Sequence, residues 1–167
     1  MVCHSQKSVA VFLIVTISCL FFSSAYADGY CFKEAGTRYG VSHILLKAIS
    51  EVESGGDIHA VNFNRSSSTL DVGHMQINSY WKKFLGDRYD ALFEGCYCTM
   101  VGAWILKQCI ERYDYSWDAV SCYHTGSGLS DGNSDRKREN GLKYVRKVQN
   151  TLGIMGDFKI SEQKDSK

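Results

Sequence analysis

The chain has 167 residues, with 19 lysines and arginines against 18 aspartates and glutamates. A nucleic-acid-binding surface needs a basic excess, so this balance argues against a nucleic-acid partner. The length suits a single domain with one hydrophobic core, and the sequence contains no internal repeat and no interdomain linker.

The first 27 residues have the pattern of a secretory signal peptide. Lys7 makes the start positive, residues 9–22 are an almost uninterrupted apolar run, and Ala25-Tyr26-Ala27 is a cleavage pattern. The alternative is a transmembrane anchor, but an apolar run of about 14 residues is too short to span a bilayer comfortably. We therefore predict cleavage before Asp28 and a mature chain that does not stay in the membrane.

The mature chain begins with two predicted helices and a predicted β segment. Residues 31–39 form a short helix that Gly40 ends, and Ser42 is a suitable N-cap for the second helix. Apolar residues of this second helix recur on one stripe until a Gly-Gly pair ends it: Ile44, Leu45, Ala48, Ile49 and Val52. Residues 57–74 are rich in polar turn residues, which predicts a small β hairpin.

The rest of the chain is predicted to be mainly helical. Four segments predict helices, of which the second is apolar enough to be the central buried one: residues 79–85, 96–113, 117–122 and 142–148. Residues 129–140 predict an exposed loop, and the polar end, residues 156–167, is predicted to be disordered. The expected domain covers residues 28–155, and its class is α+β.

Two carboxylates have positions that suit glycoside cleavage. Glu53 lies in the last turn of its helix, where the negative end of the helix dipole disfavours an ionised carboxylate and so favours a general acid. Glu51 flanks the same apolar stripe, and periodicity does not choose between these two acids. Asp71 lies near Gly73 and several amide side chains, where it either stabilises developing positive charge or caps a turn.

Five cysteines follow the signal peptide, and export to an oxidising compartment favours disulfides among them. Cys109 and Cys122 lie in consecutive predicted helices joined by a short turn, so a bridge between them is plausible. A zinc site at Cys96-x-Cys98 is disfavoured because its one-residue gap is shorter than the usual spacing of metal ligands. We therefore expect no metal.

Four short motifs occur in order along the chain: Glu53-Ser54, Gly73-His74-Met75-Gln76, Tyr123-His124-Thr125-Gly126 and Tyr144-Val145-Arg146-Lys147-Val148. Their order and spacing resemble those of the lysozyme-like lytic transglycosylases of bacterial cell walls. They are most similar to the small ones associated with secretion, conjugation and pilus systems. The resemblance implies a lysozyme-like fold, mostly helical, with a small β hairpin beside the active-site cleft.

The resemblance also implies roles for the motif residues. It places the catalytic acid on Glu53, the second of the two acids on that helix, and implies that Ser54 orients the acid or the sugar. Gln76 would hydrogen-bond the substrate and Met75 would line the cleft. Tyr123 would donate a hydrogen bond to the Glu53 carboxyl region.

Two positions depart from the family pattern. His74 stands where the family usually has leucine, and His124 stands where it usually has asparagine. His124 is still expected to meet substrate or orient the cleft, with a charge that depends on pH. In related enzymes the first-helix cysteine pairs with the one before the central helix, which implies a Cys31–Cys96 bridge and leaves Cys98 as the odd thiol.

Residues 69–79 resemble a second pattern, S-T-D-Y-G-x-x-Q-I-N-S of the c-type lysozymes. The aspartate of that pattern is the second catalytic carboxylate, which favours a catalytic role for Asp71 over turn capping. Asn62 and Asn64 precede it and are further candidates for lining the cleft.

The function that the resemblance implies is cleavage of the β-1,4 bond between N-acetylmuramic acid and N-acetylglucosamine in peptidoglycan, with a 1,6-anhydro product and no cofactor. The enzyme would act in the periplasm as a monomer and open the wall locally for a secretion, conjugation or pilus apparatus. One alternative is a hydrolytic lysozyme that uses Glu53 and Asp71. Another is a non-catalytic peptidoglycan-binding module, which only His74 and His124 favour. A third is an assembly protein recruited to a secretion apparatus, with residues 156–167 as its contact.

Overall fold

A computed structural model describes residues 29–132 and 134–155 of the chain. The predicted signal peptide and the predicted disordered tail lie outside these residues. None of the helices in the described part combines the length and the apolar character that crossing a bilayer requires.

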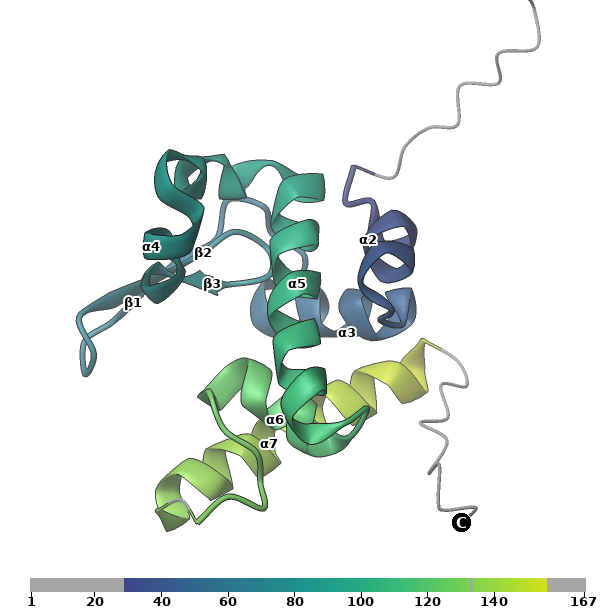
Figure 1. Ribbon diagram of the computed structural model, residues 1–167, viewed down its shortest axis with the longest axis vertical. Helices are drawn as coiled ribbons and strands as arrows, with labels where there is room; N and C mark the ends of the chain where they lie inside the picture. Colours follow the sequence, from purple (N-terminus) through teal and green to yellow (C-terminus); the bar gives the residue numbers. More distant parts are fainter. Residues whose placement is uncertain (1–28, 133, 156–167) are drawn as a thin grey trace, which may run out of the picture.

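Helix α5 (Gly95–Tyr113) runs through the middle of the molecule, and the other elements pack around it (Figure 1). Helix α2 (Phe32–Tyr39) lies to one side of α5, and α3 (His43–Ser54) passes behind it in the view of Figure 1. Val101, Ala103 and other apolar residues of α5 are buried in the main core. The prediction of a central buried helix is therefore confirmed.

The remaining helices complete the two ends of the molecule. Helices α6 (Trp117–Thr125) and α7 (Asp135–Ile154) lie across the C-terminal end of α5, and these two helices pack against each other. The short helix α4 (Lys82–Leu85) lies at the other end, between the 3-10 turns Ser79–Trp81 and Gly86–Phe93. The predicted helix 79–85 is thus a 3-10 turn that continues into α4.

A small antiparallel sheet stands beside α5, with the strand order β1 (Val61–Asn64), β2 (Thr69–Val72), β3 (Ile77–Asn78). The first two strands are the predicted hairpin. The third strand was not predicted, because two residues are too short to show the alternating pattern of a strand. It pairs Asp71 with Asn78, and so adds a second neighbour to the strand that carries the carboxylate.

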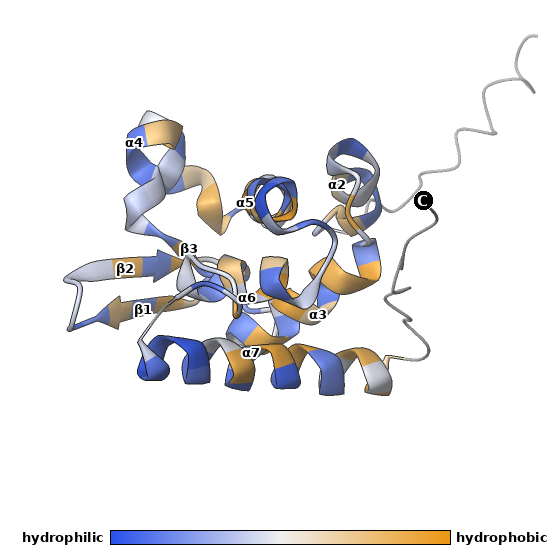
Figure 2. Ribbon diagram, turned by 60° about the horizontal axis from the view of Figure 1, so that its bottom comes forward, coloured by the Kyte–Doolittle hydropathy of each residue, from blue (hydrophilic) through white to orange (hydrophobic). Residues whose placement is uncertain are grey.

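Helix α7 begins earlier and ends later than predicted. Residues 135–140 were expected in an exposed loop, but they form its first turns, which are mostly polar (Figure 2). Without an apolar stripe these turns give no periodic signal, yet their basic and acidic residues favour a helix. An ion pair of 2.7 Å between Lys143 Nζ and Glu139 Oε1, one turn apart, adds to this preference.

Close packing fixes the loop between β2 and β3. Gly73 has φ of 74°, and a Cβ atom there would lie 2.5 Å from the carbonyl oxygen of Leu92. A Cβ atom on Gly102 of α5 would lie 2.6 Å from Met75 Cε. Both glycines are needed for the loop to lie directly against the chain around α5.

Candidate active site

A cleft of about 770 Å³ opens between the sheet and the helices α3, α5 and α6. Six of the residues expected at the cleft line it, whereas Asn62 does not: Glu53, Asn64, Asp71, Gln76, Tyr123 and His124. The cleft is largely polar at the sheet, where asparagine and serine side chains surround the acid of β2. Such a polar cleft suits a substrate rich in hydroxyl and amide groups.

Helix α3 places Glu53 at the edge of this cleft. Ser42 caps the start of the helix by accepting from the Leu45 amide at 3.3 Å, and Gly55 ends it with φ of 67°. The side chain of Glu53 is 12% exposed and lines the cleft. Glu51, in contrast, is exposed and is not part of the lining. The geometry thus distinguishes two acids that periodicity left equivalent.

Asp71 is held from both neighbouring strands. Its two carboxylate oxygens accept from Asn64 Nδ2 and Asn78 Nδ2, each at 2.6 Å. Both donors are side-chain amides from β1 and β3, so the carboxylate lies across the sheet and does not cap a turn. Two neutral donors orient the group and leave its negative charge available in the cleft.

Gln76 and Tyr123 both line the cleft, and both hydrogen-bond the loop between β2 and β3. Gln76 Nε2 donates to the Gly73 carbonyl at 2.9 Å, and its oxygen accepts from Asn62. The Tyr123 hydroxyl donates to the Met75 carbonyl at 2.8 Å, so the expected donation to the Glu53 carboxyl region is wrong. Burial, followed by the nearby charge of Glu53, raises the pKa of Tyr123 well above its usual range.

Two predicted substrate contacts lie outside the cleft. Met75 was expected to line it, but its side chain is fully buried against Gly102. The turn directs the side chain into the core and turns the Met75 carbonyl toward Tyr123. Ser54 was expected to orient the acid or the sugar, but its hydroxyl donates to the His74 carbonyl at 3.0 Å and is absent from the cleft lining.

The two histidines that depart from the family pattern have different environments. His74 is fully buried, with Nδ1 2.7 Å from Ser50 Oγ and Nε2 3.0 Å from the Gly95 carbonyl oxygen. Desolvation lowers the pKa of His74, and the hydrogen bond to Gly95 opposes this only in part. His124 instead stacks on the Tyr144 ring and places Nδ1 3.8 Å from Glu53 Oε1.

A known protein family matches most of this chain. The family described as "Transglycosylase SLT domain" matches residues 30–145. This chain belongs to that family. The match includes Glu53, Asp71 and Tyr123, and it extends across the helices and the sheet that form the cleft. The protein is therefore a lytic transglycosylase with a lysozyme-like α+β fold.

Similar proteins support this assignment along most of the chain. "Invasion protein IagB" of Salmonella typhimurium (strain SL1344) is 35% identical over 141 residues, which is 82% of each chain. "Protein IpgF" of Shigella flexneri is 35% identical over 122 residues, 71% of this chain and 76% of its own. A "Putative peptidoglycan-binding-like protein" of Escherichia coli (strain K12) is 27% identical over 145 residues, 80% of this chain and 90% of its own.

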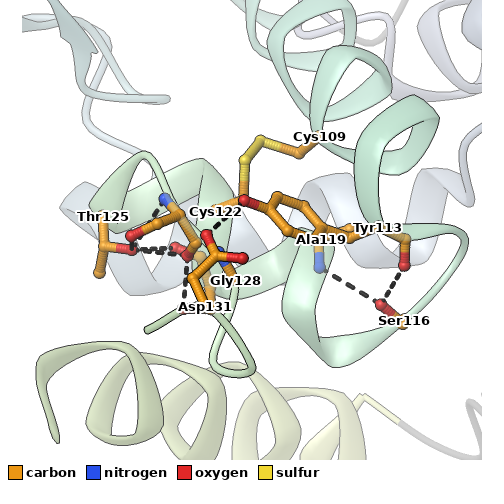
Figure 3. Close-up of a disulfide and its surroundings, with 10 residues drawn as sticks. Cys109, Tyr113, Ser116, Ala119, Cys122, Thr125, Gly128 and Asp131 are labelled. Carbon is orange, nitrogen blue, oxygen red and sulfur yellow. Dashed lines mark hydrogen bonds between the residues drawn. A yellow bond between two sulfur atoms is a disulfide. The ribbon is translucent and has the colours of Figure 1, made fainter. Parts of the chain in front are cut away.

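Within residues 29–132 and 134–155 two disulfides join helices, and both are the expected pairs. Cys31–Cys96 joins the starts of α2 and α5. Cys109–Cys122 joins α5 to α6 (Figure 3). Both cysteines line the cleft. Cys98 is the free thiol of the described residues and is buried, which raises its pKa to about 12. Because Cys96 is in a disulfide, the zinc hypothesis for Cys96-x-Cys98 is wrong.

Three site residues were not assigned a role from the sequence. Asn78 holds Asp71, and the c-type lysozyme pattern that contains it was the signal available. Asn140 lines the cleft from the part of α7 that was expected to be a loop. Tyr144 opens the fourth motif, and its buried hydroxyl lies beside Glu53. Burial, followed by the charge of Glu53, raises the pKa of Tyr144 well above its usual range.

Proposed function

We propose that Glu53 is the general acid and base of this transglycosylase, and that Asp71 stabilises the positively charged sugar. The substrate is the peptidoglycan glycan strand, cut at the β-1,4 bond between N-acetylmuramic acid and N-acetylglucosamine. The observation that carries the proposal is the largely buried Glu53 carboxyl, which shares one cleft with an Asp71 carboxylate oriented by two asparagines.

The reaction proceeds in two steps on one carboxyl group. Glu53 first donates its proton to the glycosidic oxygen as the bond to the muramic acid C1 breaks, and the departing sugar leaves as an alcohol. The oxocarbenium-like centre at C1 is stabilised by the Asp71 carboxylate or by the N-acetyl group of the sugar. Glu53, now ionised, then removes the proton of the 6-hydroxyl, whose oxygen closes on C1 to give the 1,6-anhydro ring.

Gln76 and His124 complete the proposed substrate site. Gln76 lies in the cleft with one amide edge already bonded to the loop, so its position is fixed before substrate arrives. His124 lies beside Glu53 and is partly exposed, where it can hydrogen-bond a sugar substituent. Neither role involves a cofactor.

We further propose that the enzyme acts in the periplasm as a monomer, after cleavage of a signal peptide at residues 1–27. There it would open the wall locally for a secretion, conjugation or pilus apparatus. The sequence pattern of the first 27 residues supports export, and the resemblance of the motifs to small secretion-associated enzymes supports the partner. The name of the Salmonella relative, an invasion protein, is consistent with this role.

The test is mass spectrometry of the fragments that the purified protein releases from cell-wall sacculi. We expect products about 18 Da lighter than hydrolysis products, because ring closure takes the place of water. Glu53→Gln, which keeps the shape of the side chain, should lower the rate by roughly 100- to 10,000-fold. Glu51→Gln is the matched control, since it removes an acid from the same helix outside the cleft, and should keep normal activity.

Each result has a defined consequence. Full activity of Glu53→Gln would refute the assignment of the acid. Reducing ends in place of anhydro ends would mean that water attacks in the second step, as in a hydrolytic lysozyme. Folded protein that releases nothing would favour a binding role.

A further inference from the structure

A second cavity, of about 350 Å³, branches from the cleft at the catalytic acid. Glu53, His124 and Asn140 line both spaces, so the two meet at the carboxyl group. The branch runs along α7, where Lys143 and Lys147 form its outer side. Its volume lies in the range of small-ligand sites, roughly 300 to 1,000 Å³.

Two lysines, Lys143 and Lys147, line the branch away from Glu53. Helix α7 carries six basic and two acidic residues, which gives this helix a net charge of +4. Lys143 pairs with the exposed Glu139, while Lys147 has no anionic partner among the described residues. Glu53 is the one acid among the residues that line the branch, and its carboxyl group takes part in the proposed proton transfers. A ligand in the branch is therefore expected to carry carboxylates or other anionic groups.

The chemistry of the substrate provides such a ligand at this place. The sugar whose C1 is cleaved is N-acetylmuramic acid, and its C3 oxygen carries the lactyl-linked stem peptide. C3 lies two ring carbons from C1, so the peptide leaves the glycan strand within one sugar ring of Glu53. The stem peptide carries free carboxylates, and a cleft that holds the strand must let it pass.

We propose that the branch along α7 binds the stem peptide of the muramic acid at the cleavage site, with Lys143 and Lys147 contacting its carboxylates. This inference rests on the proposed function and adds a specificity to it: the enzyme prefers peptide-bearing strands over bare ones. Each exposed lysine–carboxylate contact is weak, and two together favour the peptide-bearing strand by roughly two- to thirtyfold.

The experiment compares kcat/KM on glycan strands that keep their peptides with kcat/KM on the same strands after an amidase has removed the peptides. The ratio of the two values measures the preference, and it does not depend on the fraction of correctly folded enzyme. The mature protein, without residues 1–27, is used, as wild type and as Lys143→Gln/Lys147→Gln. Lys33→Gln/Lys47→Gln is the matched control, because it removes two exposed lysines of α2 and α3 that line neither space.

We expect the wild type and the control to prefer peptide-bearing strands, and the Lys143→Gln/Lys147→Gln ratio to fall by roughly two- to thirtyfold. Lys147→Gln alone, which leaves the Lys143–Glu139 pair intact, should give part of this fall. Lys143→Arg/Lys147→Arg should keep the preference, because both charges remain. Salt should weaken the wild-type preference, since these lysines are exposed.

A wild type that cleaves both substrates equally, or an unchanged ratio in the double variant, would overturn the proposal while leaving the transglycosylase activity established. A wild type that cleaves neither substrate would mean that the proposed function itself fails, and the inference would fall with it.

Discussion

Replacing the buried His74 by leucine, the usual residue of the family, should make the protein less sensitive to acid. Burial lowers the pKa of His74 in the folded protein, whereas in the unfolded chain a histidine titrates near its ordinary value of about 6.5. Below that pH the unfolded state therefore binds more protons than the folded state. The free energy of unfolding then falls as the pH falls, until the folded pKa is reached.

The size of the effect follows from the two protonation states. The slope reaches at most about 1.4 kcal/mol per pH unit, and it develops only below the unfolded pKa. Between pH 7.5 and 5.5 His74 therefore costs the folded state at most about 1.4 kcal/mol. His74→Leu removes this cost at pH 5.5. It also deprives Ser50 of its partner, which lowers stability at pH 7.5 by about 1–3 kcal/mol.

The assay is urea unfolding at pH 7.5, 6.5 and 5.5 for wild type and His74→Leu. We expect the variant to start lower and to lose about 1 kcal/mol less than wild type on acidification. His74→Leu/Ser50→Ala should recover part of the loss at pH 7.5, because it removes the unpaired hydroxyl. An identical pH dependence in wild type and His74→Leu would refute the reasoning.

The cysteines give two further predictions. Removing the Cys31–Cys96 bridge, which spans 65 residues, should cost about 4 kcal/mol, and removing Cys109–Cys122, which spans 13, about 3 kcal/mol. Urea unfolding of the two double serine variants would measure this, and the reverse order would contradict a loop-length effect. Cys98 should not react with a thiol reagent at pH 8 until guanidinium unfolds the protein; Cys98→Ala is the blank, and rapid reaction of the native thiol would contradict its burial.

The helices that could be predicted from the sequence are those whose apolar residues recur with a clear helical period. The apolar stretch of α5 and the stripe of α3 both correspond to real buried faces. The first turns of α7 are mostly polar, so no pattern could separate them from a loop. Because residues 135–140 were assigned to a loop, the place of Asn140 in the cleft lining could not be predicted, nor could the contribution of α7 to the cleft.

The motifs could not predict in which direction each side chain of the site points. Both residues of Met75-Gln76 belong to one motif, yet the first is buried against α5 and the second lies in the cleft. Their separation depends on the positive φ of 48° at Gln76 and on the close approach to Gly102, neither of which is visible in residue types. Glu53 could be chosen over Glu51 by resemblance only, because their helical angles are equivalent.

The loop that follows β2 is a junction between the walls of the cleft. Ser54 of α3 donates to the His74 carbonyl, and Tyr123 of α6 donates to the Met75 carbonyl. The helix that carries Glu53, the strand that carries Asp71 and the helix that carries Tyr123 are thus attached at adjacent peptide groups. The loop therefore sets the spacing between Glu53 and Asp71. If a variant at His74 or Met75 were inactive, the loss would indicate that this spacing had changed. It would not show that either side chain contacts the sugar.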